Sequence, residues 1–174
     1  MKRFLVVVDM QKDFVDGALG SSEAVSIVDN VVAKIAAFDG EIIVTYDTHA
    51  ENYLQTAEGR CLPVPHCIKG SDGWQLDARV AQALEGHSYT ALEKPTFGSV
   101  TLPGVIAEAA AGEAFSVELV GLCTDICVVS NALLLKAHYP ECDIAVDASC
   151  CAGVSVQTHE AALATMRCCQ IVVK

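Results

Sequence analysis

The run Phe4-Leu-Val-Val-Val8, followed at once by Asp9, decides the fold that the sequence predicts. All its side chains are apolar, whereas a strand with one face in water alternates apolar and polar residues. Unbroken apolar strands are typical of parallel sheets, because helices cover both faces of such a sheet. The run therefore predicts a central strand of an α/β domain.

Strand-like runs alternate with longer helical stretches along the rest of the chain. The predicted strands are residues 4–8, 41–46, 89–92, 116–120, 143–146 and 170–173. The predicted helices cover about residues 22–38, 74–84, 105–111, 126–138 and 155–167. This alternation predicts a three-layer α/β/α, Rossmann-like fold around a mostly parallel, six-stranded sheet. There is no internal repeat or low-complexity linker, so we expect one domain over residues 1–174.

Composition and charge exclude several classes of partner. Hydrophobic residues make up 52% of the chain, and the net charge is −11. Such a charge disfavours nucleic acid and anionic membranes, which bind through Lys and Arg, and leaves a small molecule as the expected partner. The apolar run 4–8 is too short for a signal peptide or a membrane span of about 20 residues. We therefore expect a cytoplasmic protein.

The chain has nine cysteines, an odd number with no secretory signal. This pattern does not indicate a disulfide framework, and most of these residues should pack as small hydrophobes. The vicinal pairs Cys150-Cys151 and Cys168-Cys169 are expected to be filler in the core or near the surface. A catalytic role requires an environment that changes the reactivity of the thiol, and the sequence predicts such an environment for one of the nine cysteines.

That cysteine lies in the segment Gly121-Leu-Cys-Thr-Asp-Ile-Cys127, which is predicted as a strand end, a tight turn and a helix start. We expect Thr124 or Asp125 to cap the helix and Cys127 to lie in its first turn. Unpaired N–H groups and the helix dipole there are expected to lower the thiol pKa and to receive an oxyanion. Cys127 could instead be a core residue, or form a metal or redox pair with Cys123. The Cys-x₃-Cys spacing disfavours that pair.

Other polar residues follow predicted strands, and ligands bind at the carboxyl ends of parallel strands. Asp9 follows the first strand, Asp47 and His49 the second, and Lys94 the third. Taken singly, Asp9 could cap a turn and Lys94 could be an ordinary solvated lysine. Together they are expected at one edge of the sheet, beside Cys127.

An irregular segment, residues 48–73, follows the second strand, and long irregular segments in compact domains are usually functional. With the strand end before it, this region offers Asp47, His49, Glu58 and His66, a donor set that suits zinc, iron or manganese. Glu58 is the least secure of these ligands, and Glu51 is its competitor. The alternative interpretation is a polar loop without a metal.

Four stretches together resemble the isochorismatase-like cysteine hydrolase superfamily, and within it the nicotinamidases (pyrazinamidases). They are Val8-Asp-Met-Gln-Lys-Asp-Phe14, Asp47-Thr-His49, Lys94-Pro-Thr-Phe97 and Gly121-Leu-Cys-Thr-Asp-Ile-Cys-Val128, in the expected order over nearly the whole chain. The resemblance implies a catalytic triad of Asp9, Lys94 and Cys127. It also implies an oxyanion hole of the Cys123 and Cys127 N–H groups, with a cis Leu122–Cys123 peptide.

The resemblance further implies a linear carboxamide as substrate, first of all nicotinamide, and one divalent metal, first of all zinc, that orients its pyridine nitrogen. Pocket candidates are Phe14, Leu19, Phe97 and Ile126, and Trp74 could line the pocket or the core. The chain is short, and it has Thr48 where many nicotinamidases carry tryptophan, so a different amide or a ureido compound is an alternative substrate. A metal- or thiol-dependent binding or redox protein is the alternative from another class. Members of the family often form dimers or larger assemblies, so a homo-oligomer is a further expectation.

Overall fold

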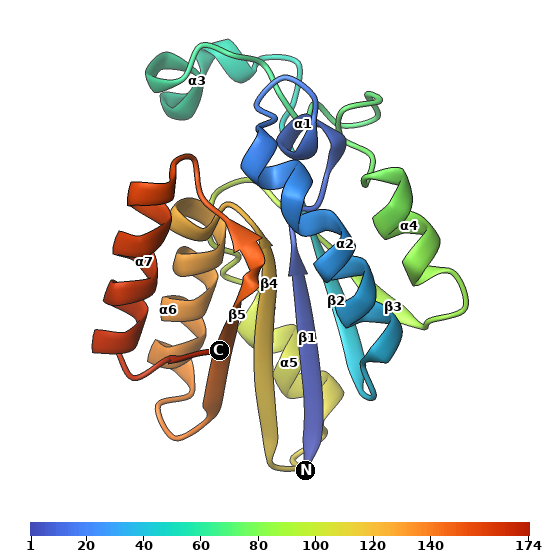
Figure 1. Ribbon diagram of the computed structural model, residues 1–174, viewed down its shortest axis with the longest axis vertical. Coiled ribbons are helices and arrows are strands. Elements are labelled where there is room, and N and C mark those ends of the chain that lie inside the picture. Colours follow the sequence, from blue (N-terminus) through green and yellow to red (C-terminus); the bar gives the residue numbers. More distant parts are fainter.

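A computed structural model describes residues 1–174 and has a parallel six-stranded sheet at its centre (Figure 1). The strands are β1 (Lys2–Val8), β2 (Glu41–Asp47), β3 (Tyr89–Lys94), β4 (Phe115–Leu122), β5 (Asp143–Ala152) and β6 (Val172–Val173). Their order is β3-β2-β1-β4-β5-β6, and every neighbouring pair is parallel. The predicted α/β class and six-stranded sheet are confirmed.

Helices cover both faces of the sheet (Figure 1). One face carries α2 (Ser22–Ala37) and α4 (Ala78–Leu84), and the other carries α5 (Leu102–Ala110), α6 (Val129–His138) and α7 (Val156–Cys168). Strand β1 feeds both cores, with Leu5 and Val7 in one and Phe4, Val6 and Val8 in the other. All five side chains are buried, which explains why the run is apolar without alternation.

Several predicted boundaries are wrong by a few residues. Helix α4 begins at Ala78 and not at Trp74, because Asp77 caps it by accepting a hydrogen bond from the Arg79 N–H. Strand β5 continues to Ala152, whereas β6 contains only Val172–Val173. The predicted helix from residue 126 begins earlier, as a π-helical turn (Thr124–Val128) that continues into α6.

Three short helices were not predicted. They are α1 (Lys12–Val15), the 3₁₀ turn η1 (Tyr53–Gln55) and α3 (Ala57–Cys61). Each is too short to produce a helical hydrophobic period in the sequence. In Figure 1 they lie above the carboxyl edge of the sheet, where they frame the site described next. The structure contains no helix of the length and apolarity that a membrane crossing requires.

Candidate active site

Three predicted residues from separate elements meet at the carboxyl edge of the sheet. Asp9 follows β1, Lys94 ends β3, and Cys127 lies in the π-helical turn after β4. The Lys94 Nζ lies 2.6 Å from Asp9 Oδ2 and 3.5 Å from Cys127 Sγ. All three residues are buried. The structure thus brings a carboxyl group, a lysine ammonium and a thiol into one contact group.

Asp9 is held by a contact that the sequence did not reveal. Its backbone has a φ of 48°, in the left-handed region that residues other than glycine seldom adopt. The Thr45 hydroxyl donates a hydrogen bond of 2.6 Å to Asp9 Oδ1, and the other carboxylate oxygen faces Lys94. Both oxygens therefore have fixed partners, which orients the carboxylate toward the thiol.

Burial and the neighbouring charges together determine the protonation of Asp9 and Lys94. It raises the pKa of Asp9, against the opposing effects of Lys94 and Thr45. Burial disfavours the charged form of Lys94, but Asp9, Cys127 and Asp47 outweigh it and hold the Lys94 pKa above its usual value. Lys94 therefore stays a cation, in contact with both Asp9 and Cys127.

The prediction that the helix start lowers the pKa of Cys127 is wrong. Burial, with the nearby Asp9 carboxylate, raises the pKa of the Cys127 thiol well above its usual value, and the opposing effect of Lys94 is smaller. Because the sulfur is buried, removal of water disfavours the thiolate more strongly than the helix start favours it. Cys127 therefore rests as a thiol and needs a base.

The turn that carries Cys127 differs from the predicted capped helix. Cys123 occupies the N-cap position, and its side chain makes no capping bond. Thr124 instead pairs with His159 Nδ1 at 2.8 Å, and both Asp125 carboxylate oxygens accept from the Val154 N–H at 3.1 Å. Thr124 thus fastens the turn that carries Cys127 to α7, and Asp125 fastens it to the segment between β5 and α7.

One of the two predicted oxyanion-hole donors, the N–H of Cys123, is free in the structure. The Leu122–Cys123 peptide is cis. The backbone N–H of Cys123 makes no hydrogen bond within the protein, and Cys123 lines the same cavity as Cys127. A free N–H beside the thiol can receive the negative oxygen of a tetrahedral intermediate.

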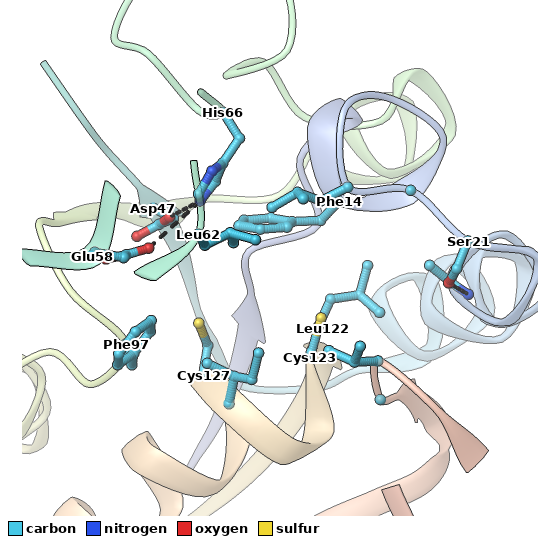
Figure 2. A pocket seen from close by; sticks show the side chains of 16 residues that line it. Phe14, Ser21, Asp47, Glu58, Leu62, His66, Phe97, Leu122, Cys123 and Cys127 are labelled. Atoms are coloured by element: carbon cyan, nitrogen blue, oxygen red, sulfur yellow. Dashed lines mark hydrogen bonds and ion pairs between the residues drawn. The ribbon is translucent and has the colours of Figure 1, made fainter. Parts of the chain in front are cut away.

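The four predicted metal ligands also converge. Ligand atoms of Asp47, His49, Glu58 and His66 all lie within 4.8 Å of one another. Asp47 Oδ2 lies 2.9 Å from His49 Nε2 and 3.6 Å from His66 Nε2. Figure 2 shows His66 pointing toward Asp47 and Glu58. Glu51, the competing candidate, is exposed and is not part of this cluster.

Two details show that this cluster fits a divalent cation. His49 Nε2 is buried and makes no hydrogen bond, although Asp47 Oδ2 lies 2.9 Å away, as two ligand atoms directed at one cation would. His66 Nδ1 lies 2.8 Å from the Val64 carbonyl, which only accepts hydrogen bonds. That contact places the proton on Nδ1, and it leaves the lone pair of His66 Nε2 free to coordinate a metal ion. Two imidazoles and two carboxylates suit zinc, iron or manganese.

Asp47 connects the metal cluster to the triad, and Gln11 holds Asp47. Asp47 Oδ1 lies 3.2 Å from Lys94 Nζ, while its other oxygen faces the histidines. The Gln11 side chain accepts from the Asp47 N–H at 2.8 Å and donates to the Asp47 carbonyl at 2.9 Å. Gln11 is fully buried. Gln11 belongs to the motif of residues 8–14, two residues after Asp9. Its place in that motif was the sequence signal for a role in positioning the site.

A cavity of about 400 Å³ joins the two groups (Figure 2). The four predicted pocket residues all line it, namely Phe14, Leu19, Phe97 and Ile126. Leu62 and Val154 line it as well and were not predicted, because both lie in segments without a regular period. Trp74 does not line this cavity; its indole N–H donates to Thr48 Oγ1 at 2.9 Å.

The remaining cysteines do not converge on a second site. All nine thiols are free. Cys150 and Cys151 are buried in β5, as expected of filler, whereas Cys168 and Cys169 are exposed at the end of α7.

Comparison with known proteins places this arrangement in a class of hydrolases. A sequence model of the isochorismatase domain matches residues 3–174, and the chain therefore belongs to the isochorismatase family. The sequence resemblance to that superfamily is confirmed.

Among the individual proteins that the chain resembles are nicotinamidases and a second amidase. The isochorismatase family protein PncA of Bacillus subtilis is 29% identical over 146 residues, covering 76% of this chain and 78% of the relative. A crystal structure of the B. subtilis nicotinamidase/pyrazinamidase PncA superposes with a TM-score of 0.86, at 27% identity over 99% of both chains. The N-carbamoylsarcosine amidase of Thermoplasma acidophilum gives a TM-score of 0.76 at 25% identity, over 100% of this chain and 96% of that one.

Proposed function

We propose that this protein is a cysteine amidohydrolase that converts nicotinamide to nicotinate and ammonia, with residues 1–174 acting as one catalytic domain. The observation that carries the proposal is the contact group of Asp9, Lys94 and Cys127, which shares one cavity with a cluster of metal donors. The nicotinamidase similarity supports the same substrate.

The first half of the reaction forms a thioester. The Cys127 sulfur attacks the carboxamide carbon while Asp9 takes the thiol proton. The carbonyl oxygen becomes negative and is received by the N–H groups of Cys123 and Cys127. As the intermediate collapses, Asp9 returns its proton to the amide nitrogen, the C–N bond breaks and ammonia leaves.

The second half releases the acid. Asp9, again ionised, takes a proton from a water molecule that attacks the thioester carbon. Collapse breaks the C–S bond, and the proton on Asp9 returns to the Cys127 sulfur. Lys94 stays charged throughout and stabilises whichever of its two partners is negative. The cycle regenerates the buried neutral thiol that the pKa of Cys127 implies.

Asp47, His49, Glu58 and His66 would hold one divalent metal, with zinc the first expectation from the donor set. Bound there, the metal supplies a Lewis acid for the ring nitrogen of the substrate. Phe14 lies beside this cluster, with its ring centroid 5.4 Å from that of His66. It offers a flat apolar surface for the pyridine ring.

The charges in the cavity favour an uncharged amide over an acidic one. The ionisable lining residues, apart from thiols, are Asp47, Glu58 and His66, and no arginine or lysine lines the cavity. Lys94 is fully buried behind it and is paired with Asp9 and Asp47. Apart from the proposed metal ion, a substrate carboxylate would therefore find no free cation in the cavity. A ureido or amide substrate that carries a carboxylate away from the metal is thus disfavoured.

The decisive experiment measures ammonia release from nicotinamide by the purified protein, with and without a chelator. We expect turnover that chelation reduces and that Cys127→Ala lowers by about 10⁴-fold or more, with the fold intact by circular dichroism. Full activity of Cys127→Ala would exclude the mechanism.

The alternatives give different results. Ammonia release from ureido compounds but not from nicotinamide would indicate the related substrate class. Labelling by an electrophile that spreads over several cysteines, and does not favour Cys127, would indicate a thiol-dependent redox or binding protein.

A further inference from the structure

The cavity is larger than the proposed substrate requires. Pockets of about 300–1,000 Å³ hold drug-sized ligands, and this cavity measures about 400 Å³. Nicotinamide is a single pyridine ring with one carboxamide. A ring beside the metal cluster and an amide beside Cys127 leave part of the cavity without a substrate atom.

The remaining space lies on the far side of Cys127 from the metal donors. In Figure 2, Ser21, Leu122 and Cys123 lie on this side, whereas His66, Asp47 and Glu58 lie on the other. We call this part the distal lobe. It is formed by the start of α2, the end of β4 and the segment after β5, with the lining residues Leu19, Gly20, Ser21, Ala24, Leu122, Cys123, Gly153 and Val154.

The chemistry of the distal lobe is apolar. None of its lining residues is an acid, a lysine, an arginine or a histidine. The Ser21 hydroxyl accepts a hydrogen bond from the Ala24 N–H, and the Val154 N–H donates to Asp125. Burial raises the pKa of the Cys123 thiol to about 12, so it is neutral near pH 7. Such a surface suits an uncharged hydrocarbon group.

The geometry of a secondary amide directs such a group into this lobe. The carbon substituents on the two sides of an amide bond prefer the trans arrangement. When the ring points to the metal cluster and the carbonyl carbon lies at Cys127, the substituent on the nitrogen extends away from the ring. That direction leads to the distal lobe.

We propose that the site also hydrolyses secondary carboxamides whose nitrogen carries an uncharged apolar substituent, which occupies the distal lobe and leaves as a primary amine. The inference rests on the proposed function, because it uses the same nucleophile and the same ring position. The bonds balance as before. Asp9 gives the thiol proton to the nitrogen, the C–N bond breaks, and an alkylamine leaves in place of ammonia.

The test uses nicotinamide, N-butylnicotinamide and nicotinoylglycine, whose substituent is a carboxylate of similar length. Dissociation constants are measured by calorimetry on the Cys127→Ala protein, and amine release is measured on the unmodified protein. We expect N-butylnicotinamide to bind roughly tenfold or more tightly than nicotinamide, because the butyl chain leaves water. It should be hydrolysed to butylamine, whereas nicotinoylglycine should be neither bound nor hydrolysed.

Two variants fill the lobe. Ala24→Leu narrows it from α2, and Val154→Trp narrows it from a side chain that is 64% exposed and tolerates replacement. Both should remove the binding gain of the butyl chain and lower kcat/KM for N-butylnicotinamide about tenfold or more. The control is Val25→Leu, an exposed neighbour on α2 that does not line the cavity and should change nothing.

The outcomes separate the two proposals. If nicotinamide is neither bound nor hydrolysed, the proposed function fails, and this inference fails with it. If nicotinamide is hydrolysed but N-butylnicotinamide binds no better, or if the lobe variants treat both amides alike, the distal lobe is not a substrate subsite.

Discussion

Asp9 depends on two neighbours, Lys94 and Thr45, for its orientation and its proton affinity. Its carboxylate is buried between Lys94 and Thr45, and burial raises its pKa while both neighbours lower it. Lys94 acts through charge, whereas the uncharged Thr45 hydroxyl donates a 2.6 Å hydrogen bond to Asp9 Oδ1 and accepts one of 3.2 Å from the Asp9 N–H. Thr45 can therefore be replaced without removing a charge, which makes it the cleaner site for testing whether Asp9 is the base.

Thr45→Val removes the hydroxyl and keeps the shape of the side chain. Without that donor the ionised form of Asp9 loses a hydrogen bond, so the pKa of Asp9 rises. Because the base must be ionised, the acid limb of the kcat/KM profile should move to higher pH, by about half to one unit. Thr45→Ser keeps a hydroxyl and should restore the original profile. An unchanged or lowered acid limb in Thr45→Val would contradict Asp9 as the base.

The sequence predicts which residues form the candidate site, but it does not predict their protonation states. The motifs predicted the identities of Asp9, Lys94 and Cys127, and the structure brings these three together. The state of Cys127 was not predictable, because its pKa depends on burial by segments distant in the sequence. For Gln11 the first motif gave a signal, but the role itself was not predictable, since its two hydrogen bonds to Asp47 span 36 residues.

At the scale of elements, the strands were easier to predict than the helix starts and the loops. Runs of apolar residues mark the buried strands β1, β2 and β4, and the alternation of short strand-like and longer helical stretches located β3 and the first part of β5. The start of α4 depends on the side chain of Asp77, and the turn after β4 depends on bonds to His159 and Val154. Such long-range contacts leave no local period in the sequence.

One glycine controls how closely β1 and β4 approach beneath the site. Gly121 has a φ of 115°, and a Cβ there would lie 2.1 Å from the Val8 carbonyl oxygen. Asp9 follows Val8 directly, and Gly121 begins the segment that leads to Cys127. The pairing of these two strands therefore sets the distance between Asp9 and Cys127, the proposed base and nucleophile.

Gly121→Ala should lower the free energy of unfolding by roughly 2–4 kcal/mol, because the methyl group collides with backbone and the φ is unfavourable for alanine. Urea unfolding measures the loss. The matched control is Gly104→Ala in α5, where a Cβ meets nothing within 4 Å. That change should be neutral or should stabilise the protein by about 0.5–1 kcal/mol. Equal losses in both variants would exclude the strand approach as the cause.

At the scale of the whole molecule, a charge network away from the active site joins α2, β4, β5 and the C-terminus. Lys34 Nζ lies 2.8 Å from Glu118 Oε1 and 2.6 Å from Asp147 Oδ2, and Lys174 Nζ lies 2.9 Å from Glu118 Oε2. Burial raises the pKa values of both carboxyl groups, but hydrogen bonds from the network outweigh it and hold them below their usual range.

Carboxyl groups with lowered pKa values make stability depend on pH in a defined direction. The folded protein binds fewer protons at these groups than the unfolded chain does, so their contribution is complete above the unfolded pKa of about 4. It is lost as the pH falls through the lower folded values. The free energy of unfolding should therefore fall below about pH 4.

Lys34→Met tests this network, because it removes the cation that both carboxylates share. At pH 7 the variant should be less stable by about 1–3 kcal/mol, since partly buried carboxylates lose a charged donor. The difference should narrow below about pH 4, where protonation removes the benefit from the unmodified protein as well.

Lys69→Met is the control, because the Lys69–Glu93 pair is exposed and should contribute little. Chemical unfolding between pH 3 and pH 7 gives both curves, and a constant difference between Lys34→Met and the unmodified protein would show that these carboxylates do not titrate with folding. Because the active-site residues are the same in all three proteins, their own titration cancels from the comparison.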